Sequence, residues 1–309
     1  MTLIATKADP IPAGATVEWL RAADGTRIRA ARWCPDSATL GTVVILNGRT
    51  EFIEKYFEVI GNLLERGYAV ASLDWRGQGL SDRPLANRHK GHVVNFDLYV
   101  SDLHQVMNEF IAPACPRPFR ALSHSMGGNI TLRYLHQHSG VFTAAAFSAP
   151  MWGIGKAARP GTALRAFSAL TNAIGLGRSY VPGAGGDYDD SAREFEDNPL
   201  THDAERFARF VAQIDAEPRL ELGAPTLGWG GQAIRSMDLT HAEGFAEAIS
   251  IPIRVCSAGA DALVSVAAQT LLCQRLPNAK QIVIPEAKHE LLMEIDTYRK
   301  LMFAAFDEL

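Results

Sequence analysis

The sequence predicts an α/β protein with a mostly parallel central sheet, helices on both faces and one helical insertion. Short apolar runs typical of buried strands alternate with amphipathic segments between residues 42 and 148, and the alternation resumes at residue 253. Parallel strands need such intervening helices, because each connection must return the chain to the same end of the sheet. Residues 151–250 carry no strand-like run. We therefore expect a core of residues 1–150 and 251–309 and a helical cap of residues 151–250.

Individual elements follow from the period of the apolar residues and from turn and capping residues. Asp24-Gly25 is typical of a hairpin turn, Gly67 of a helix end and Thr201 of a helix N-cap. The predicted strands are residues 17–21, 27–33, 42–46, 68–73, 119–122, 143–148, 253–257 and 281–284. The predicted helices are residues 55–66, 97–110, 126–138 and 201–214, one that ends near 276, and 296–306.

Composition indicates an ordinary globular protein. The chain has 309 residues, of which 47% are hydrophobic, enough for a substantial core. A net charge of −4 without a basic patch argues against nucleic-acid binding. Residues 1–10 lack the pattern of a signal peptide, and no apolar window approaches the length of a membrane span. We expect a cytoplasmic protein, and transient contact of the cap with a membrane surface stays open.

The cysteines predict neither a zinc site nor a redox motif. They contain no C-x-x-C pair, and no two of them have the spacing of zinc ligands. We expect all of them to be reduced. The four positions are Cys34, Cys115, Cys256 and Cys273.

A candidate nucleophile lies between the predicted strand 119–122 and the predicted helix 126–138. Ser125 stands in Ser-His-Ser-Met-Gly, and a serine at a tight strand-to-helix turn with glycine two residues later is typical of a nucleophile elbow. The usual pattern has glycine where this chain has Ser123. The first amides of the helix, beginning with that of Met126, would face a developing oxyanion beside the serine hydroxyl.

A base and an orienting carboxylate are expected after the last two strands. Asp261 follows the strand 253–257 and His289 follows the strand 281–284, which gives the chain order serine, aspartate, histidine. A second oxyanion donor is expected after the strand 42–46, where Gly48 lets the amide of Arg49 turn toward the same point. We expect His124 to pack beneath the site.

At these positions the chain resembles α/β hydrolases of the group that contains bacterial lysophospholipase L2 and monoacylglycerol lipase, which is often placed with serine aminopeptidase-like hydrolases. The resemblance covers nearly the whole chain and is most specific around the elbow. Asn47 and Lys55 stand where that family has histidine and arginine. The matching positions are Gly48, Glu51, Tyr56, Asp74, Gly77, Gly79, Ser81, His124 to Gly128, Asp261 and His289.

The resemblance implies an α/β-hydrolase fold and hydrolysis of a small-molecule ester or lipid without metal or cofactor. Ser125 would attack the ester, His289 would be the base and Asp261 would orient it, while the amides of Arg49 and Met126 would form the oxyanion hole. Monoacylglycerols, lysophospholipids and small synthetic esters all remain open as substrates. Apolar residues of the insertion suggest an acyl site: Trp152, Ile154, Phe167, Phe207 and Trp229.

Two other functions are compatible with the same sequence. A peptidase that cleaves small N-terminal residues would need an acidic group in the cap for a free amine. Asp187, Asp189, Asp190, Glu194 and Glu196 cluster there, although such a run is more often simply solvated. A non-catalytic protein of the same fold that binds an apolar ligand is the other alternative. The sequence indicates no oligomeric state.

Overall fold

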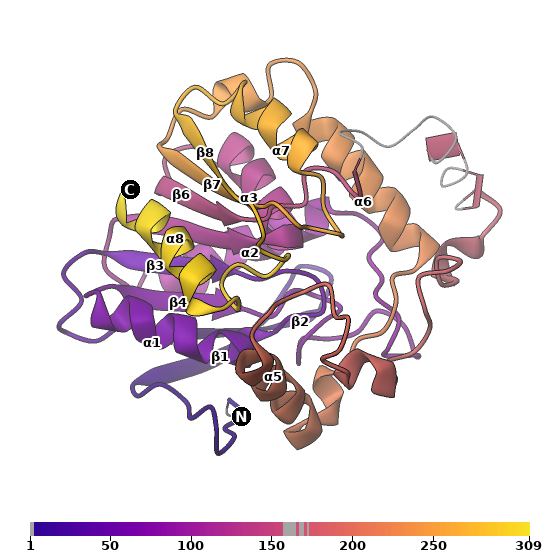
Figure 1. The fold of residues 1–309 in the computed structure, drawn as a ribbon, viewed down its shortest axis with the longest axis horizontal. Helices are drawn as coiled ribbons and strands as arrows, with labels where there is room; N and C mark the ends of the chain where they lie inside the picture. Colours follow the sequence, from indigo (N-terminus) through magenta and orange to yellow (C-terminus); the bar gives the residue numbers. More distant parts are fainter. Residues whose placement is uncertain (1–2, 157–164, 167–169, 172) are drawn as a thin grey trace.

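A single eight-stranded sheet forms the centre of the molecule (Figure 1). The computed structural model describes residues 3–156, 165–166, 170–171 and 173–309. The strand order is β1-β2-β4-β3-β5-β6-β7-β8. β1 pairs antiparallel with β2 and β2 antiparallel with β4, whereas every other neighbouring pair is parallel. The mostly parallel sheet predicted from the sequence is therefore confirmed.

The elements lie within a few residues of their predicted positions. The strands are β1 Ala15–Arg21, β2 Arg27–Trp33, β3 Thr42–Leu46, β4 Ala69–Leu73, β5 Phe119–His124, β6 Phe142–Ser148, β7 Ile253–Ala258 and β8 Ala279–Ile284. The α-helices are α1 Phe57–Glu65, α2 Asp97–Val106, α3 Ser125–Gln137, α5 Ala204–Ala216, α6 Leu227–Thr240, α7 Val266–Cys273 and α8 Asp296–Asp307. A 3-10 turn, Ile53–Tyr56, precedes α1, and a π-helical turn, Met107–Ile111, continues α2.

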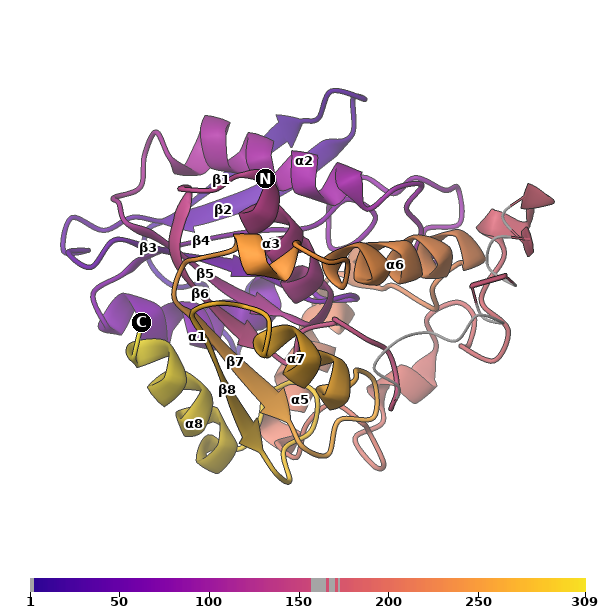
Figure 2. The same cartoon turned by 90° about the horizontal axis from the view of Figure 1, so that it is seen from above.

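Helices cover both faces of the sheet. α1 and α8 lie on one face, and α2 and α3 lie on the opposite face (Figure 2). Every residue of β3 is buried, as expected for a central strand with helices on both sides. The continuous apolar run of this strand is thus explained by its position in the middle of the sheet.

The segment 151–250 leaves the sheet after β6 and returns to it at β7. Its described residues form α5, α6 and short 3-10 turns, with no strand of the central sheet among them. Leu200 O accepts a hydrogen bond from Glu290 N at 2.9 Å, and Ser236 on α6 donates to Asn129 on α3. The segment therefore packs over the carboxyl ends of the strands, where ligand sites of α/β proteins lie.

Two features of this segment differ from the sequence-based prediction. Asp203, not Thr201, caps α5, because the Asp203 carboxylate accepts from Arg206 N at 2.9 Å. Thr201 Oγ1 instead accepts from Asp203 N and donates to Met293 O. The helix α6 was not predicted, because three of its first five residues are glycines, which disfavour a helix. Thr226 caps it, and packing against α3 stabilises it.

The prediction of four reduced cysteines was wrong for two of them. Cys34 and Cys115 form a disulfide, with Cα atoms 5.7 Å apart and a sequence separation of 81 residues. Cys256 and Cys273 are free. Disulfides are rare in reducing compartments, so this bond weighs against the cytoplasmic location, which stays a prediction. Within the described residues, no helix has both the length and the apolar character needed to cross a bilayer.

A buried ion pair network ties β2 to the loops that follow β3 and β4. The Arg29 guanidinium lies 2.6 Å from Glu54 and 2.7 Å from Asp74, and all three side chains are fully buried. Asp74 also accepts from Ile53 N at 3.0 Å and from Leu80 N at 2.7 Å. Asp74 therefore holds together the loop after β3 and the turn after β4.

Replacing Arg29 by methionine would leave two buried carboxylates without their cation. We expect Arg29→Met to lower the free energy of unfolding by about 3–5 kcal/mol, measured by urea denaturation. Arg27→Met is the matched control on the same strand, because the Arg27–Asp82 pair is exposed and screened by solvent, so its loss should change the free energy of unfolding far less. If both substitutions lowered the free energy of unfolding equally, the buried network would not contribute more to stability than an exposed ion pair.

Candidate active site

The turn between β5 and α3 has the geometry of an elbow. Ser125 is the first residue of α3 and has a φ of 49°, a left-handed conformation that costs energy in a non-glycine residue. A Cβ on Gly127 would lie 2.1 Å from Leu46 O, and one on Gly128 would lie 2.6 Å from Pro150 Cβ. Only glycine fits at these two positions. Ser123, where the usual pattern has glycine, fits because it is fully buried with a hydrogen bond to Ala146 O at 3.4 Å.

The three predicted relay residues lie within hydrogen-bonding distance of one another. His289 Nε2 lies 3.0 Å from Ser125 Oγ, and His289 Nδ1 lies 2.7 Å from Asp261 Oδ2. Because the Asp261 carboxylate can only accept, Nδ1 carries the proton and Nε2 is left to accept from the serine hydroxyl. The sequence therefore located all three side chains, from three separate loops.

Asp261 is held as a carboxylate. Burial opposes its charge, but the hydrogen bond from His289 and those from the amides of Leu263 and Val264, at 2.8 and 2.9 Å, lower the pKa of Asp261 below its ordinary value. The same two amides fix the orientation of the carboxylate.

The loop after β3 lies directly against the elbow. A Cβ on Gly48 would be 3.2 Å from Ser125 Cβ, so the backbone approaches the serine closely. Gln78 Nε2 donates to Gly48 O at 2.7 Å and to Glu51 O at 3.1 Å. The C=O of Gly48 and the N–H of Arg49 belong to one planar peptide unit, so fixing the carbonyl also fixes the direction of the Arg49 amide.

A charged cluster is buried beneath this loop. Lys55 Nζ lies 2.9 Å from Glu51 Oε1 and 2.5 Å from Glu290 Oε1. The other carboxylate oxygen of Glu51 accepts from Gly48 N and, at 2.7 Å, from Tyr56 Oη. Burial raises the pKa of Glu51, but Lys55, His124 and the hydrogen bond from Tyr56 together outweigh it and lower that pKa to about 2. Burial raises the pKa of Glu290, and Lys55 offsets this only in part.

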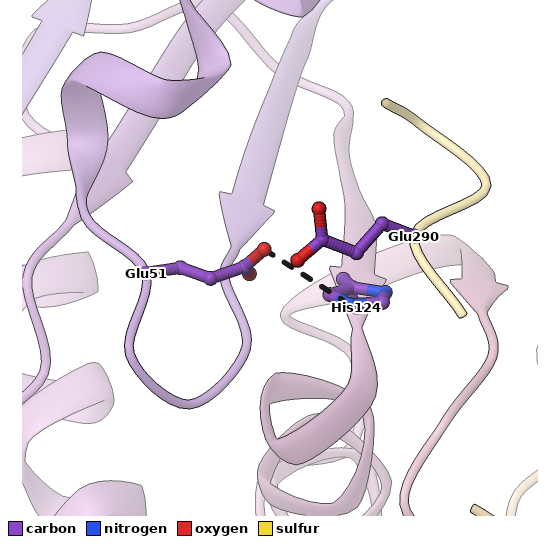
Figure 3. Close-up of side chains that lie close together, drawn as sticks. All are labelled: Glu51, His124 and Glu290. Carbon is purple, nitrogen blue, oxygen red and sulfur yellow. Dashed lines mark ion pairs between the residues drawn. The ribbon is translucent and has the colours of Figure 1, made fainter. Parts of the chain in front are cut away.

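Glu51, His124 and Glu290 converge closely enough to be considered as metal ligands (Figure 3). The Lys55 ammonium, which contacts both carboxylates, already supplies the positive charge that a cation would bring. The donor set is thus accounted for by an internal ion pair. That no metal is required stays a prediction.

His124 lies beneath the relay, as expected. Its ring centroid is 4.7 Å from that of His289, its Nδ1 contacts Ser148 O at 3.0 Å, and its Nε2 lies 4.0 Å from Glu51. Burial lowers the pKa of His124 to about 4, against a smaller opposing effect of Glu51. The imidazole is therefore neutral at pH 7.

A cavity of about 320 Å³ opens beside the loop after β3. Thr50 lines it on the core side, and Leu200, whose carbonyl accepts from Glu290 N, lines it on the side of the insertion. Its wall is more apolar than polar, with Glu194 and Glu196 among the polar residues. The apolar lining residues include Leu200, Phe207, Phe210, Ile214, Leu220 and Leu222.

The residues predicted to bind substrate occupy different environments. Phe207 lines the cavity. Trp152 is fully buried and packs on Phe147, with ring centroids 5.1 Å apart, and Trp229 is buried against Phe96. Ile154 is 48% exposed, and Phe167 lies outside the described residues.

Three residues of the site were not given a site role from the sequence. Gln78 carries no local signal, because its partners lie about 30 residues away. Lys55 was assigned to a helix and to a position where the family has arginine, without a site role, although its spacing from Glu51 permits an ion pair within one helical turn. Glu290 has no partner nearby in the sequence, because its contact with Lys55 depends on the tertiary fold.

Comparison with known proteins shows similarity over most of the chain. The family model described as serine aminopeptidase, S33 matches residues 37–296. Lysophospholipase L2 of Escherichia coli (strain K12) is 32% identical over 271 residues, which cover 85% of this chain and 78% of that protein. Probable lysophospholipase L2 of Haemophilus influenzae is 30% identical over 267 residues, which cover 86% of this chain and 82% of that protein.

A solved structure with a similar fold is a soluble variant of monoglyceride lipase from Saccharomyces cerevisiae in complex with a substrate analog. The TM-score is 0.73 at 16% sequence identity, and the match covers 98% of this chain and 97% of that one. This likeness, together with the sheet order, confirms the predicted α/β-hydrolase fold.

Neutral His124 makes the stability of the protein depend on pH. The unfolded chain binds a proton at this residue near pH 6.5 and the folded protein only near pH 4, so the free energy of unfolding falls as the pH falls between these values. We expect the penalty of His124→Gln to be about 2 kcal/mol smaller at pH 4.5 than at pH 7, measured by urea denaturation. The same penalty at both pH values would contradict the assignment.

Proposed function

The chain belongs to the serine aminopeptidase, S33, family of α/β hydrolases, and from this premise we propose that it hydrolyses carboxylic esters through an acyl-enzyme on Ser125. The observation that carries the proposal is the relay in which His289 contacts Ser125 at 3.0 Å and Asp261 at 2.7 Å. A nucleophile, a base and an orienting group at these distances are the parts that acyl transfer needs. Lysophospholipids and monoacylglycerols are the substrate classes named for its relatives and the first to be tested.

In the first half of the reaction, His289 Nε2 takes the proton of Ser125 as the serine oxygen attacks the ester carbonyl. The tetrahedral intermediate collapses, the bond to the alcohol breaks, and the leaving alcohol takes the proton from Nε2. In the second half, a water molecule gives its proton to Nε2 and attacks the acyl-enzyme. Collapse of that intermediate releases the acid and returns the proton to Ser125. Asp261 keeps the imidazole in the required tautomer and stabilises its cation.

The amides of Arg49 and Met126 stabilise the oxyanion in both halves. Met126 N is among the first amides of α3, which have no partner within the helix and which the helix dipole favours for a negative charge. The Arg49 amide shares its peptide plane with Gly48 O, which Gln78 holds at 2.7 Å. Donors fixed before the reaction need no reorganisation when charge develops.

Residues 151–250 act as a cap that holds the acyl chain. The cavity beside Thr50 and Phe207 has a more apolar than polar wall and borders the loop after β3 at Thr50. Phe207 contacts the chain, while Trp152 and Trp229 support the surrounding packing. Transient contact of this cap with a membrane surface would deliver a lipid substrate, and no cofactor takes part.

Peptidase activity on small N-terminal residues is the second candidate. The specific observation in its favour is that Glu194 and Glu196 line the cavity, where a carboxylate could pair with a free amine. A panel of monoacylglycerols, lysophospholipids and aminoacyl-anilides separates the two activities. Preferential turnover of the anilides would favour the peptidase.

Ser125→Ala removes the nucleophile, and alanine must adopt the same left-handed backbone conformation as the serine. We expect kcat for p-nitrophenyl butyrate to fall at least about 10⁴-fold, with the melting temperature within about 2 °C of the wild type. The wild type should be labelled by a fluorophosphonate and the variant should not. Retained turnover in the variant would refute the assignment, and an unlabelled wild type would favour a non-catalytic ligand-binding protein.

Gln78→Leu should loosen the peptide that carries the Arg49 amide. We expect kcat to fall roughly 10- to 100-fold with KM within about threefold of the wild type, because the oxyanion forms only after binding. Thr42→Val is the matched control, since Thr42 is also buried and its hydroxyl donates to a backbone carbonyl, Pro116 O at 2.6 Å, at the start of β3, the end away from the loop. A comparable loss of kcat in the control would mean that Gln78 acts only through stability.

A further inference from the structure

The Arg49 guanidinium has no carboxylate partner within the part of the chain that the structure describes. Other arginines in the interior, such as Arg29 and Arg76, lie within 2.7 Å of two carboxylates each. Among the described residues, no carboxylate oxygen lies within 4.0 Å of an Arg49 side-chain nitrogen. Arg83 also lacks one, but its two terminal nitrogens donate to four backbone carbonyls. The Arg49 side chain makes one such bond, from Nη2 to Gly223 O.

The remaining hydrogen-bonding capacity of Arg49 is large. A guanidinium has five N–H donors, and Arg49 Nε is buried without a hydrogen-bond partner among the described residues. Burial lowers the pKa of Arg49 to about 10, so the group still carries its charge at neutral pH. A buried charge without a counterion is costly, and an anion bound from outside would remove that cost.

The guanidinium lies between the core and the insertion. It faces the Trp229 ring, with Cζ 5.5 Å from the ring centroid, and it contacts Gly223. A Cβ on Gly91 would be 2.7 Å from Arg49 Nη2, so only glycine leaves room for it there. None of Gly91, Gly223 and Trp229 is among the residues that line the acyl cavity. Arg49 as a whole keeps intermediate exposure, so its side chain is partly open to solvent.

We propose that the Arg49 guanidinium binds a phosphate or phosphodiester on the alcohol side of the scissile ester. This proposal rests on the proposed function, in which the amide of the same residue faces the ester oxygen. About six covalent bonds separate that amide nitrogen from Cζ, and about six separate the ester carbonyl carbon of an acylglycerol phosphate from its phosphorus, so the two spans are similar. A planar guanidinium is well suited to two parallel hydrogen bonds with phosphate oxygens. Arg49 would thus favour phosphate-bearing esters over neutral ones.

The test is a ratio of two reactions on one enzyme. The value of kcat/KM is measured for lauroyl lysophosphatidylglycerol and for monolauroylglycerol, which share the acyl chain and differ in the phosphodiester. We expect the wild type to favour the phosphodiester and Arg49→Met to lower this ratio roughly 10- to 100-fold. Any disturbance of the oxyanion amide affects both esters, so it cancels in the ratio. Arg27→Met removes one positive charge from a distant surface and should leave the ratio within about twofold of the wild type.

Two further variants keep the proposal testable if Arg49→Met does not fold. Gly91→Ala displaces the guanidinium without changing Arg49. Arg49→Lys keeps the charge but cannot form the bidentate hydrogen bonds of a guanidinium. Both should lower the ratio at least several-fold. A ratio unchanged in all of the Arg49 and Gly91 variants that fold would overturn the proposal and leave Arg49 as a contact between cap and core.

Inhibition separates a lipid headgroup from a free anion. Glycerol phosphate should inhibit hydrolysis of monolauroylglycerol by the wild type. In Arg49→Met the inhibition constant of glycerol phosphate should be at least about tenfold higher. Inhibition by inorganic phosphate alone would overturn the headgroup assignment in favour of a free-anion site. A wild type that hydrolyses neither ester would instead refute the proposed function itself, which distinguishes the two failures.

Discussion

The contact between the start of α3 and the end of β3 is the constraint on which the site depends. Gly127 approaches Leu46 O so closely that no side chain fits between them. This approach forces the turn in which Ser125 adopts a left-handed backbone conformation, and it brings Gly48 to the same serine. The position of the nucleophile and the position of the neighbouring loop are therefore set by one packing contact, and neither can shift alone.

The buried ion pairs of Lys55 also connect the loop after β3 to the segment that carries His289. Lys55 forms ion pairs with Glu51 and Glu290. Glu51 accepts a hydrogen bond from the amide of Gly48, and Glu290 directly follows His289 in the chain. Each buried charge is tolerated because the others are present. Groups that share one network do not contribute independently, so the loop and the base behave as a unit.

The fold could be predicted further than the details of the site. Burial on both faces gives β3 its uninterrupted apolar run, and the carboxyl ends of parallel strands converge, which is why three distant residues could be assigned to one relay. The glycine-rich start of α6 hid a helix that tertiary packing stabilises. The cap of α5 was misplaced by two residues because Thr201 and Asp203 are both good capping residues. The environment of Arg49 depends on contacts with the insertion, which no local pattern encodes.

The bond between Cys34 and Cys115 closes a covalent ring that contains β3, α1, β4 and α2. The loop that follows β3 is inside the ring, whereas the three relay residues all come later in the chain. In the chain-entropy description, a ring of this length lowers the conformational entropy of the unfolded chain. This stabilises the folded protein by about 4–5 kcal/mol. The thiol–disulfide balance of the surroundings can therefore change how readily the protein unfolds without altering any atom of the relay.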